Sequence, residues 1–247
     1  MNGGQGDDRF SLTGTVSDST LVGGSGSDLI TFSNAAIGSS IAGASAGGTT
    51  DTANDTVVFS ATGVSEVDVS FAEGADSLSF AKGAADATIA AAGGNDTVVA
   101  ALTLGSALVE AGAGDDSLSI SVLSGSTLKG GSGADSINLA KGISSEVYTN
   151  QGADFITASG DATTTTLAGG KGSDSIRIGG DVTGGQILGN SGADSITIAG
   201  TANSALIHGG ADNDSMTVGA IVGGTAGGGL GADTLIVNGK VTGAEVL

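Results

Sequence analysis

The chain has 247 residues, including 47 glycines and no proline, cysteine or tryptophan, and it carries a net charge of −19 from 26 acidic and 7 basic residues. Nucleic acid and anionic membrane surfaces are therefore poor partners, because binding to either requires basic surface. The absence of cysteine excludes disulfides and thiolate metal sites, and no apolar run is long enough to span a membrane. Hydrophobic residues still make up 39% of the chain, which favours a thin aliphatic core over disorder.

Twelve aspartates recur along the chain at intervals of 19 to 21 residues, except for one interval of 27. These marker aspartates are Asp8, Asp28, Asp55, Asp76, Asp96, Asp116, Asp135, Asp154, Asp174, Asp194, Asp214 and Asp233. A fixed period of this size predicts a repeat architecture, in which each repeat forms one coil and buries its apolar face against its neighbours. We expect an all-β fold: a right-handed parallel β-roll, or β-solenoid, of about 12 coils in a single domain spanning 1–247.

Each coil is expected to contain two short strands. The residues two and four positions after every marker are apolar, and mostly Ser, Thr or Asn lies between them, which predicts a half-buried strand. In chain order, the first apolar residues of these strands are Phe10, Ile30, Val57, Leu78, Val98, Leu118, Ile137, Ile156, Ile176, Ile196, Met216 and Leu235. A second apolar column lies seven residues before the marker, at Leu21, Val69, Ile89, Val109, Leu128, Val147, Leu167, Ile187 and Ile207, with Gly48 and Ala226 as exceptions.

Glycines predict the turns between these strands, because they readily adopt the positive φ of tight corners. One turn is the glycine-rich segment before each marker. The other is expected near Gly83, Gly105, Gly125, Gly142, Gly160, Gly180, Gly200, Gly219 and Gly239. The long interval between Asp28 and Asp55 holds about seven additional residues, and we expect an insertion loop within 34–51.

The marker aspartates are expected to form a row, because parallel coils place equivalent residues one strand spacing apart. Two unit charges at about 4.8 Å repel by roughly 1 kcal/mol in water and by several times more at a partly buried site. Either the carboxylates take up protons, or a cation lies between successive coils. Ca²⁺ suits such a row because it accepts six to eight carboxylate and carbonyl oxygens. Glycine two residues before the marker would aim carbonyls at the ion, as at Gly6, Gly26, Gly133, Gly172, Gly192 and Gly231.

The motif around each marker resembles a known calcium-binding repeat. Gly-Gly-x-Gly-x-Asp-x-aliphatic is the nonapeptide pattern of RTX (repeats-in-toxin) proteins. Full matches are Gly3–Phe10, Gly23–Ile30, Gly130–Ile137, Gly169–Ile176 and Gly228–Leu235, whereas Thr50–Asp55 departs most from the pattern. The motif occurs once per coil rather than twice, so the chain is most similar to the one-sided RTX rolls of large bacterial surface adhesins. The resemblance implies up to about 11 Ca²⁺ ions along one edge, held by the marker aspartates and neighbouring carbonyls.

The resemblance also implies a role. We expect a structural spacer, stalk or lattice segment of a secreted or cell-surface protein, such as an adhesin or S-layer protein, that folds on Ca²⁺ binding outside the cell. The first repeat begins at the N-terminus and the last is incomplete, so we expect a piece of a larger protein, with neighbouring domains or copies of the parent protein as possible partners. Nucleic acid and membrane insertion are not expected.

Two other interpretations are open. The marker aspartates could cap their turns without any metal. The outward Ser/Thr face beside the markers could recognise ice or a glycan, although Arg9, Leu29, Phe155 and Arg177 interrupt it. An enzyme is not expected, because His208 is the only histidine, there is no cysteine, and a repeated surface offers no single catalytic pocket.

Overall fold

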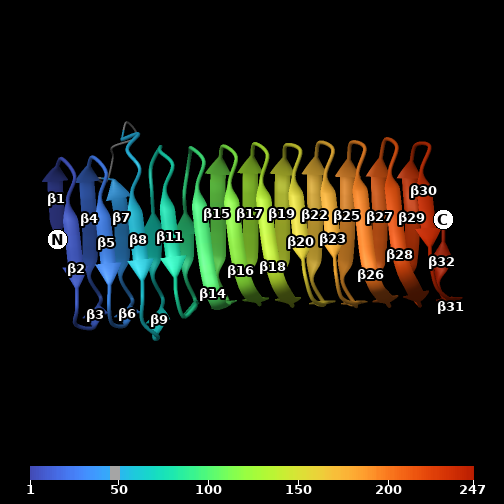
Figure 1. The fold of residues 1–247 in the computed structure, drawn as a ribbon, viewed down its shortest axis with the longest axis horizontal. Coiled ribbons are helices and arrows are strands. Elements are labelled where there is room, and N and C mark those ends of the chain that lie inside the picture. The colour runs from blue at the N-terminus through green and yellow to red at the C-terminus, as the bar shows by residue number, and fades with distance from the viewer. Residues whose placement is uncertain (45–50) are drawn as a thin grey trace.

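The computed structural model describes residues 1–44 and 51–247, which form an elongated parallel β-solenoid with the two termini at opposite ends (Figure 1). About twelve coils of about 20 residues stack along the rod, and each coil contributes strands to two facing sheets. This confirms the predicted fold class and the two strands per coil. Among the described residues, no helix is long and apolar enough to cross a membrane.

Sheet A contains the strand that precedes each marker aspartate. Its strands pair in parallel in chain order, one coil after another. They are β1 Asn2–Gln5, β4 Thr20–Ser25, β7 Ser40–Ala44, β10 Asp68–Ser70, β13 Thr88–Ala90, β15 Leu108–Ala113, β17 Thr127–Ser132, β19 Glu146–Gln151, β22 Thr166–Lys171, β25 Gln186–Ser191, β27 Leu206–Ala211, β29 Thr225–Leu230 and β32 Glu245–Val246.

Sheet B contains the strand that follows each marker. These strands are β2 Arg9–Leu12, β5 Leu29–Phe32, β8 Thr56–Phe59, β11 Ser77–Phe80, β14 Thr97–Gly105, β16 Ser117–Ser124, β18 Ser136–Ile143, β20 Phe155–Ala158, β23 Ser175–Ile178, β26 Ser195–Asn203, β28 Ser215–Val222 and β30 Thr234–Val237. In seven coils a short second segment follows a bend: β3 Val16–Ser17, β6 Ala36–Ile37, β9 Val64–Ser65, β12 Ala84–Ala85, β21 Ala162–Thr163, β24 Val182–Thr183 and β31 Val241–Thr242. In the other coils both segments form one longer strand.

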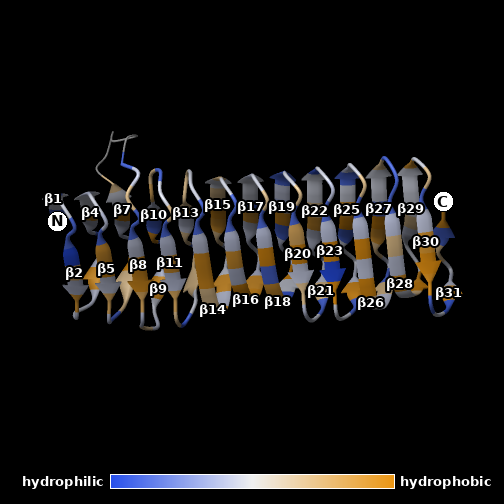
Figure 2. Ribbon diagram, turned by 45° about the horizontal axis from the view of Figure 1, so that its top comes forward, coloured by the Kyte–Doolittle hydropathy of each residue, from blue (hydrophilic) through white to orange (hydrophobic). Residues whose placement is uncertain are grey.

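The core is a set of apolar columns that run along the rod between the two sheets. Alternating hydrophobic and polar residues along the strands produce it, since successive side chains of a strand point to opposite faces (Figure 2). Leu78, for example, lies between Val57 and Val98 in register and is fully buried. Phe32, Phe59 and Phe80 stack through three successive coils with ring centroids 4.6 and 4.9 Å apart. Side chains at equivalent positions of neighbouring coils thus pack against each other, as the 20-residue period predicts.

The structure adds a third inward column that the sequence pattern did not reveal. It lies in the second segment of sheet B and includes Val64, Leu104, Leu123 and Ile221, all buried. In most coils, six residues of sequence separate the first sheet B column from this third column. The separation is seven residues in the 21-residue coil and five in the 19-residue coils, as between Leu118 and Leu123. The bend in sheet B therefore absorbs the variation in coil length, and this variable spacing hid the column.

The long interval before Asp55 is resolved by the register of the strands. Equivalent residues are 20 apart between β4 and β7 but 27 apart between β5 and β8, so the seven additional residues follow Ala44. Within the predicted insertion range, Ala36–Ile37 and Ser40–Ala44 are regular strands, while 45–50 lie outside the described residues. Ile41, not Gly48, takes the place in the sheet A column, because it pairs with Leu21 and Val69 and is fully buried.

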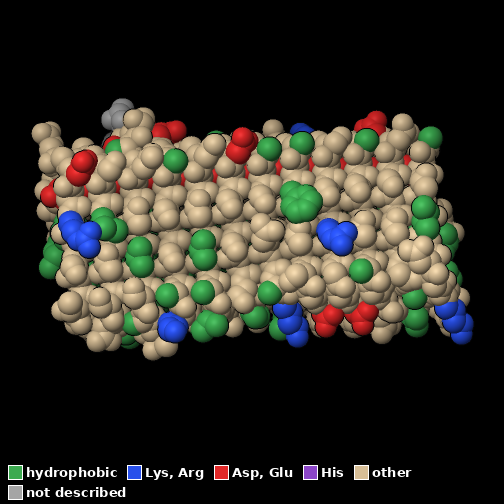
Figure 3. Space-filling view, viewed as in Figure 1, with side chains coloured by type: hydrophobic (Ala, Val, Ile, Leu, Met, Phe, Trp, Pro, Cys, Tyr) green, Lys and Arg blue, Asp and Glu red, His purple; other side chains and the backbone are tan. Residues whose placement is uncertain are grey.

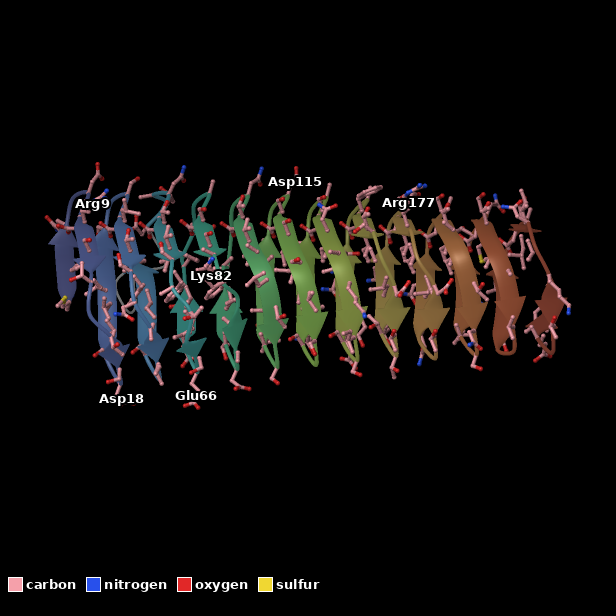
Figure 4. The ribbon with its side chains drawn as sticks, turned by 60° about the horizontal axis from the view of Figure 1, so that its bottom comes forward. Arg9, Asp18, Glu66, Lys82, Asp115 and Arg177 are labelled. Atoms are coloured by element: carbon pink, nitrogen blue, oxygen red, sulfur yellow. The ribbon has the colours of Figure 1, made fainter. Side chains whose placement is uncertain are left out.

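The edge opposite the marker aspartates, here called the turn edge, is made of left-handed residues rather than of glycines alone. Asp18, Glu66 and Ser106 have φ of 46, 53 and 49°, the position that Gly125 occupies in its coil with φ 60°. Asp18 and Glu66 point outward at this edge, whereas Asp115 lies at the other (Figure 4). Most glycines predicted to mark this turn instead lie in or near the sheet B bend, as Gly160 and Gly180 do.

Candidate metal centre

The marker aspartates lie at the edge where sheet A passes into sheet B, here called the loop edge. Each follows a glycine-rich turn and precedes a sheet B strand, so the parallel register places all of them in one file. The ten side chains from Asp28 to Asp214 are at most 3% exposed, and those of Asp8 and Asp233 in the end coils are half-buried. A row of acidic residues inside a folded edge is costly unless each carboxylate has a partner.

One carboxylate oxygen of each marker after Asp8 has a partner in the preceding coil. The backbone N–H of each marker from Asp8 to Asp214 donates a hydrogen bond to Oδ1 of the next, at 2.7 to 3.0 Å, in all eleven successive pairs. The pattern continues across the insertion, since Asp28 N donates to Asp55 Oδ1 at 2.8 Å. Asp55, the marker whose motif departs most from the repeat, therefore occupies the same position as the others.

The second carboxylate oxygen has none. Oδ2 is buried and without a hydrogen-bond partner in ten of the markers, namely Asp8, Asp28, Asp76, Asp96, Asp116, Asp135, Asp154, Asp174, Asp194 and Asp214. Burying an ionised carboxylate oxygen without a partner costs several kcal/mol, so the group must find a proton or a cation. The observation supplies a physical reason for a ligand along this edge.

Burial raises the pKa of these carboxyls. Desolvation is the largest cause, opposed by the backbone N–H that donates to Oδ1 and reinforced in most coils by neighbouring aspartates. The pKa of Asp55 and Asp174 rises to about 6, and that of Asp76, Asp96, Asp135 and Asp194 to about 7. The pKa of Asp28, Asp116, Asp154 and Asp214 is also raised. At neutral pH the four carboxyls with a pKa of about 7 therefore lie between their protonated and ionised forms.

Glycines line the row on both sides. A Cβ on Gly169, five residues before Asp174, would collide with Oδ2 of that marker, and Gly23, Gly130 and Gly189 are placed alike. The predicted glycines two residues before the markers, Gly6, Gly26, Gly133, Gly172, Gly192 and Gly231, have positive φ between 93 and 145°. In these coils glycine leaves room for the carboxylate five residues later and meets the positive φ two residues before it, whereas other coils have larger residues, such as Phe71 and Thr149, at the first position.

The geometry near these glycines brings carbonyl and carboxylate oxygens together. A Cβ on Gly152 would collide with the carbonyl oxygen of Gly133 in the preceding coil and lie 3.0 Å from Asp154 Oδ1. Other loop carbonyls already accept hydrogen bonds, as when Gly152 N donates to Lys171 O at 2.9 Å. No group of three or more His, Cys, Asp or Glu side chains converges within residues 1–44 and 51–247. A cation at this edge would therefore take carbonyl oxygens together with one or two carboxylates, a donor set that suits Ca²⁺.

A second row of side chains supports the loop edge, and the sequence reasoning missed it. Asp or Asn directly before a marker accepts the N–H of the equivalent residue one coil later, as Asn95 Oδ1 does from Asp115 N at 2.9 Å and Asp115 Oδ1 from Ala134 N at 2.7 Å. Asp7, Asn54 and Asn213 do the same. The signal that could have revealed this row is the recurrence of Asp and Asn at that position.

The outward face of sheet B offers no uninterrupted array of hydroxyls. Arg9, Leu29, Phe155 and Arg177 lie among its Ser and Thr residues, and Val99 adds a further apolar position. In the view of Figure 3, charged side chains gather along the upper and lower edges and are sparse between them. His208 lies on the outward side of sheet A, where Nδ1 is 3.2 Å from the carbonyl oxygen of Gly227.

Comparison with known proteins adds no relative. No family model, curated protein or solved structure matches the chain, so its placement rests on the parallel β-solenoid of about twelve coils and the aspartate that recurs every 20 residues, both of which are compatible with an RTX-like roll.

Proposed function

We propose that the chain is a calcium-stabilised structural rod, a one-sided RTX-like roll that serves as a spacer, stalk or lattice segment of a secreted or cell-surface protein. The observation that carries the proposal is the file of buried marker carboxylates whose Oδ2 atoms lack a partner. A divalent cation in each gap between coils would neutralise two successive carboxylates. It would also give each Oδ2 atom the partner that the protein itself does not supply.

Protons are the competing partner, and the charge of the chain favours calcium over them. The net charge is −19, and the eleven gaps between markers would add up to 22 positive charges if all were filled, so a partly filled row brings the rod close to neutrality. Protonation at neutral pH would be incomplete, since the highest pKa values are about 7. Without metal, self-repulsion along the loop edge opposes folding.

The residues that would hold the ions are the marker aspartates and the carbonyls of the glycine-rich turns. The five coils with the full motif, such as Gly130–Ile137, are expected to bind most tightly, because they have glycine at every position that closes on the carboxylate. Calcium would supply charge neutralisation and cross-linking of adjacent turns. Low calcium in the cytoplasm would leave the chain unfolded before export, and higher calcium outside the cell would drive folding.

Titration of the metal-free protein with calcium tests the proposal. Circular dichroism and small-angle scattering should show an expanded chain in EDTA at pH 7.5 and a β-rich rod on calcium addition, with Mg²⁺ much less effective because it demands a smaller octahedral site. Isothermal titration should count several ions per chain. A chain that is equally folded in EDTA and in calcium, with no heat of binding, would rule out the metal-dependent rod and leave a proton-neutralised solenoid.

A further inference from the structure

A hollow on the outward face of sheet A is not explained by the rod or its metal edge. It lies over three adjacent strands, β19, β22 and β25 (Figure 1), and has a volume of about 340 Å³. Tyr148, Ala168 and Leu188 occupy one column of this face in register. Ala168 is only 4% exposed, although it faces outward, because the larger side chains of Tyr148 and Leu188 flank it. The small side chain of Ala168 beside the larger side chain of Tyr148 leaves the hollow in this face.

Polar side chains border the hollow on the side that faces the loop edge. Asn150 and Asn190 lie two coils apart with Gly170 between them, so they are about 9–10 Å apart, and Gln151 and Lys171 lie next to them in adjacent coils. Within the described part of the chain, none of these four side chains makes a hydrogen bond to another protein group. Their donors and acceptors are therefore available to a ligand.

The two asparagines are unusual among the coils. Both have positive φ, 73° at Asn150 and 82° at Asn190, at a position where other coils have glycine, such as Gly112, Gly131 and Gly210. Glycine meets the backbone requirement there without strain. The two amides thus supply hydrogen-bonding groups beyond what the fold needs, and they do so on either side of the same hollow.

We propose that this hollow binds one hexopyranose ring of a carbohydrate chain. Tyr148 is half-buried and lines the hollow. The face of an aromatic ring carries partial negative charge and suits the C–H face of a sugar, while the Asn, Gln and Lys side chains suit its hydroxyl groups. Aromatic surface combined with a few convergent polar groups is the usual composition of a small-ligand site. The hollow is shallow and open along the rod, so it fits a sugar within a surface glycan better than an enclosed small molecule.

The site adjoins the proposed metal edge but uses other groups, because Asn150, Lys171 and Asn190 lie in the glycine-rich turns before successive markers. Its ligand-binding side chains belong to the outward face of sheet A, whereas the marker aspartates are buried between the sheets. It is also distinct from the Ser/Thr face of sheet B. A rod that displays a sugar-binding hollow would bind a glycan surface as well as span a distance.

An oligosaccharide array tests the proposal with the calcium-loaded protein, using oligomers of glucose, galactose, mannose, N-acetylglucosamine and hexuronic acid. Affinities of the oligomers that bind are then measured by titration for each variant. Tyr148→Ala should weaken binding about tenfold by removing the stacking surface. Asn150→Gly and Asn190→Gly should each weaken it roughly fivefold, the size of one or two lost hydrogen bonds, with no loss of stability because glycine is the common residue there.

His208→Ala, in the same column one coil beyond Leu188, serves as the matched control and should leave sugar binding unchanged. A gain-of-volume variant, Ala168→Leu, should abolish binding by filling the floor of the hollow while its side chain points away from the core. The proposal fails if no oligosaccharide binds, or if a bound sugar retains its affinity in both Tyr148→Ala and Ala168→Leu proteins whose circular dichroism matches that of the unmodified rod.

Discussion

Each marker aspartate uses its two carboxylate oxygens differently. Oδ1 is an internal acceptor that ties its coil to the preceding one, and this role would be filled equally well by an asparagine. Oδ2 has no partner in ten markers, and this role requires either a proton or a cation. Hydrogen bonding between coils does not by itself require a charged side chain at this position. The recurrence of aspartate rather than asparagine is therefore explained by the binding of a proton or a cation at Oδ2.

Asp135→Asn separates these two roles. In calcium-free buffer at pH 8 the variant should be more stable than the unmodified chain by about 1 kcal/mol or more, because a buried charge is removed while the Oδ1 acceptor is retained. In calcium it should be less stable and bind fewer ions. Circular dichroism in EDTA measures the folded fraction, and thermal melts in calcium measure the loss of stability. Asp115→Asn, which removes an exposed charge from the turn of the preceding coil, is the control, and an Asp135→Asn chain destabilised equally in both buffers would contradict the metal role.

Glycine substitutions distinguish the two edges of the rod. Gly172→Ala should destabilise the protein by about 1–3 kcal/mol, because Gly172 has φ of 130° and the carbonyl of Gly152 occupies the space of a Cβ. Gly184→Ala at the turn edge should cost only about 1 kcal/mol, the low end for a left-handed residue, since nothing lies near its Cβ position and Ser, Thr and Asp occupy the equivalent position in other coils. Urea unfolding in calcium compares the two, and equal losses would contradict this difference.

At the scale of the strands, the sequence predicted what repeats strictly and missed what varies. The first sheet B column and the sheet A column follow the markers at fixed spacing, so period-two alternation was enough to find them. The third column, which includes Leu104 and Leu123, was missed because the sheet B bend changes length between coils. Gly48 was misaligned with Ile41 because the seven additional residues lie after β7. The partner of Oδ1 could not be read from spacing, since rotation of the side chain decides which group each oxygen faces.

The aromatic stack joins three successive coils in the first half of the rod. Phe59 lies between Phe32 and Phe80 and is fully buried, so Phe59→Ala should lower the free energy of unfolding by about 3–5 kcal/mol. Phe155→Ala, which removes a 43% exposed ring from the outward side of β20, should change it by less than about 1 kcal/mol. Chemical denaturation in calcium measures both. Similar losses for the two variants would indicate that the buried ring stack contributes no more to stability than an exposed phenylalanine does.

At the scale of the whole molecule, the raised pKa values set the pH dependence of the metal-free rod. Because the folded-state pKa of the marker carboxyls lies above the unfolded value of 3.8, the folded chain binds more protons between about pH 4 and 7, and stability falls as pH rises through this window. Metal-free protein should therefore be more folded at pH 5 than at pH 8, as its β-sheet content by circular dichroism in EDTA measures. Calcium should reverse the trend, because it binds the ionised carboxylates. A β-sheet content in EDTA that does not change with pH would contradict the assignment.

The ladder of marker aspartates also gives the rod a direction. In every pair the amide belongs to the coil nearer the N-terminus and the carboxylate to the coil nearer the C-terminus. The folded chain thus presents a free donor at its C-terminal end and a half-buried carboxylate at its N-terminal end. A new coil that docks at the C-terminal end brings its carboxylate to a backbone N–H group that has no acceptor yet. A coil that docks at the N-terminal end must instead desolvate the carboxylate that the rod already presents there. Templated growth of the rod is therefore expected to be faster toward the C-terminus than toward the N-terminus.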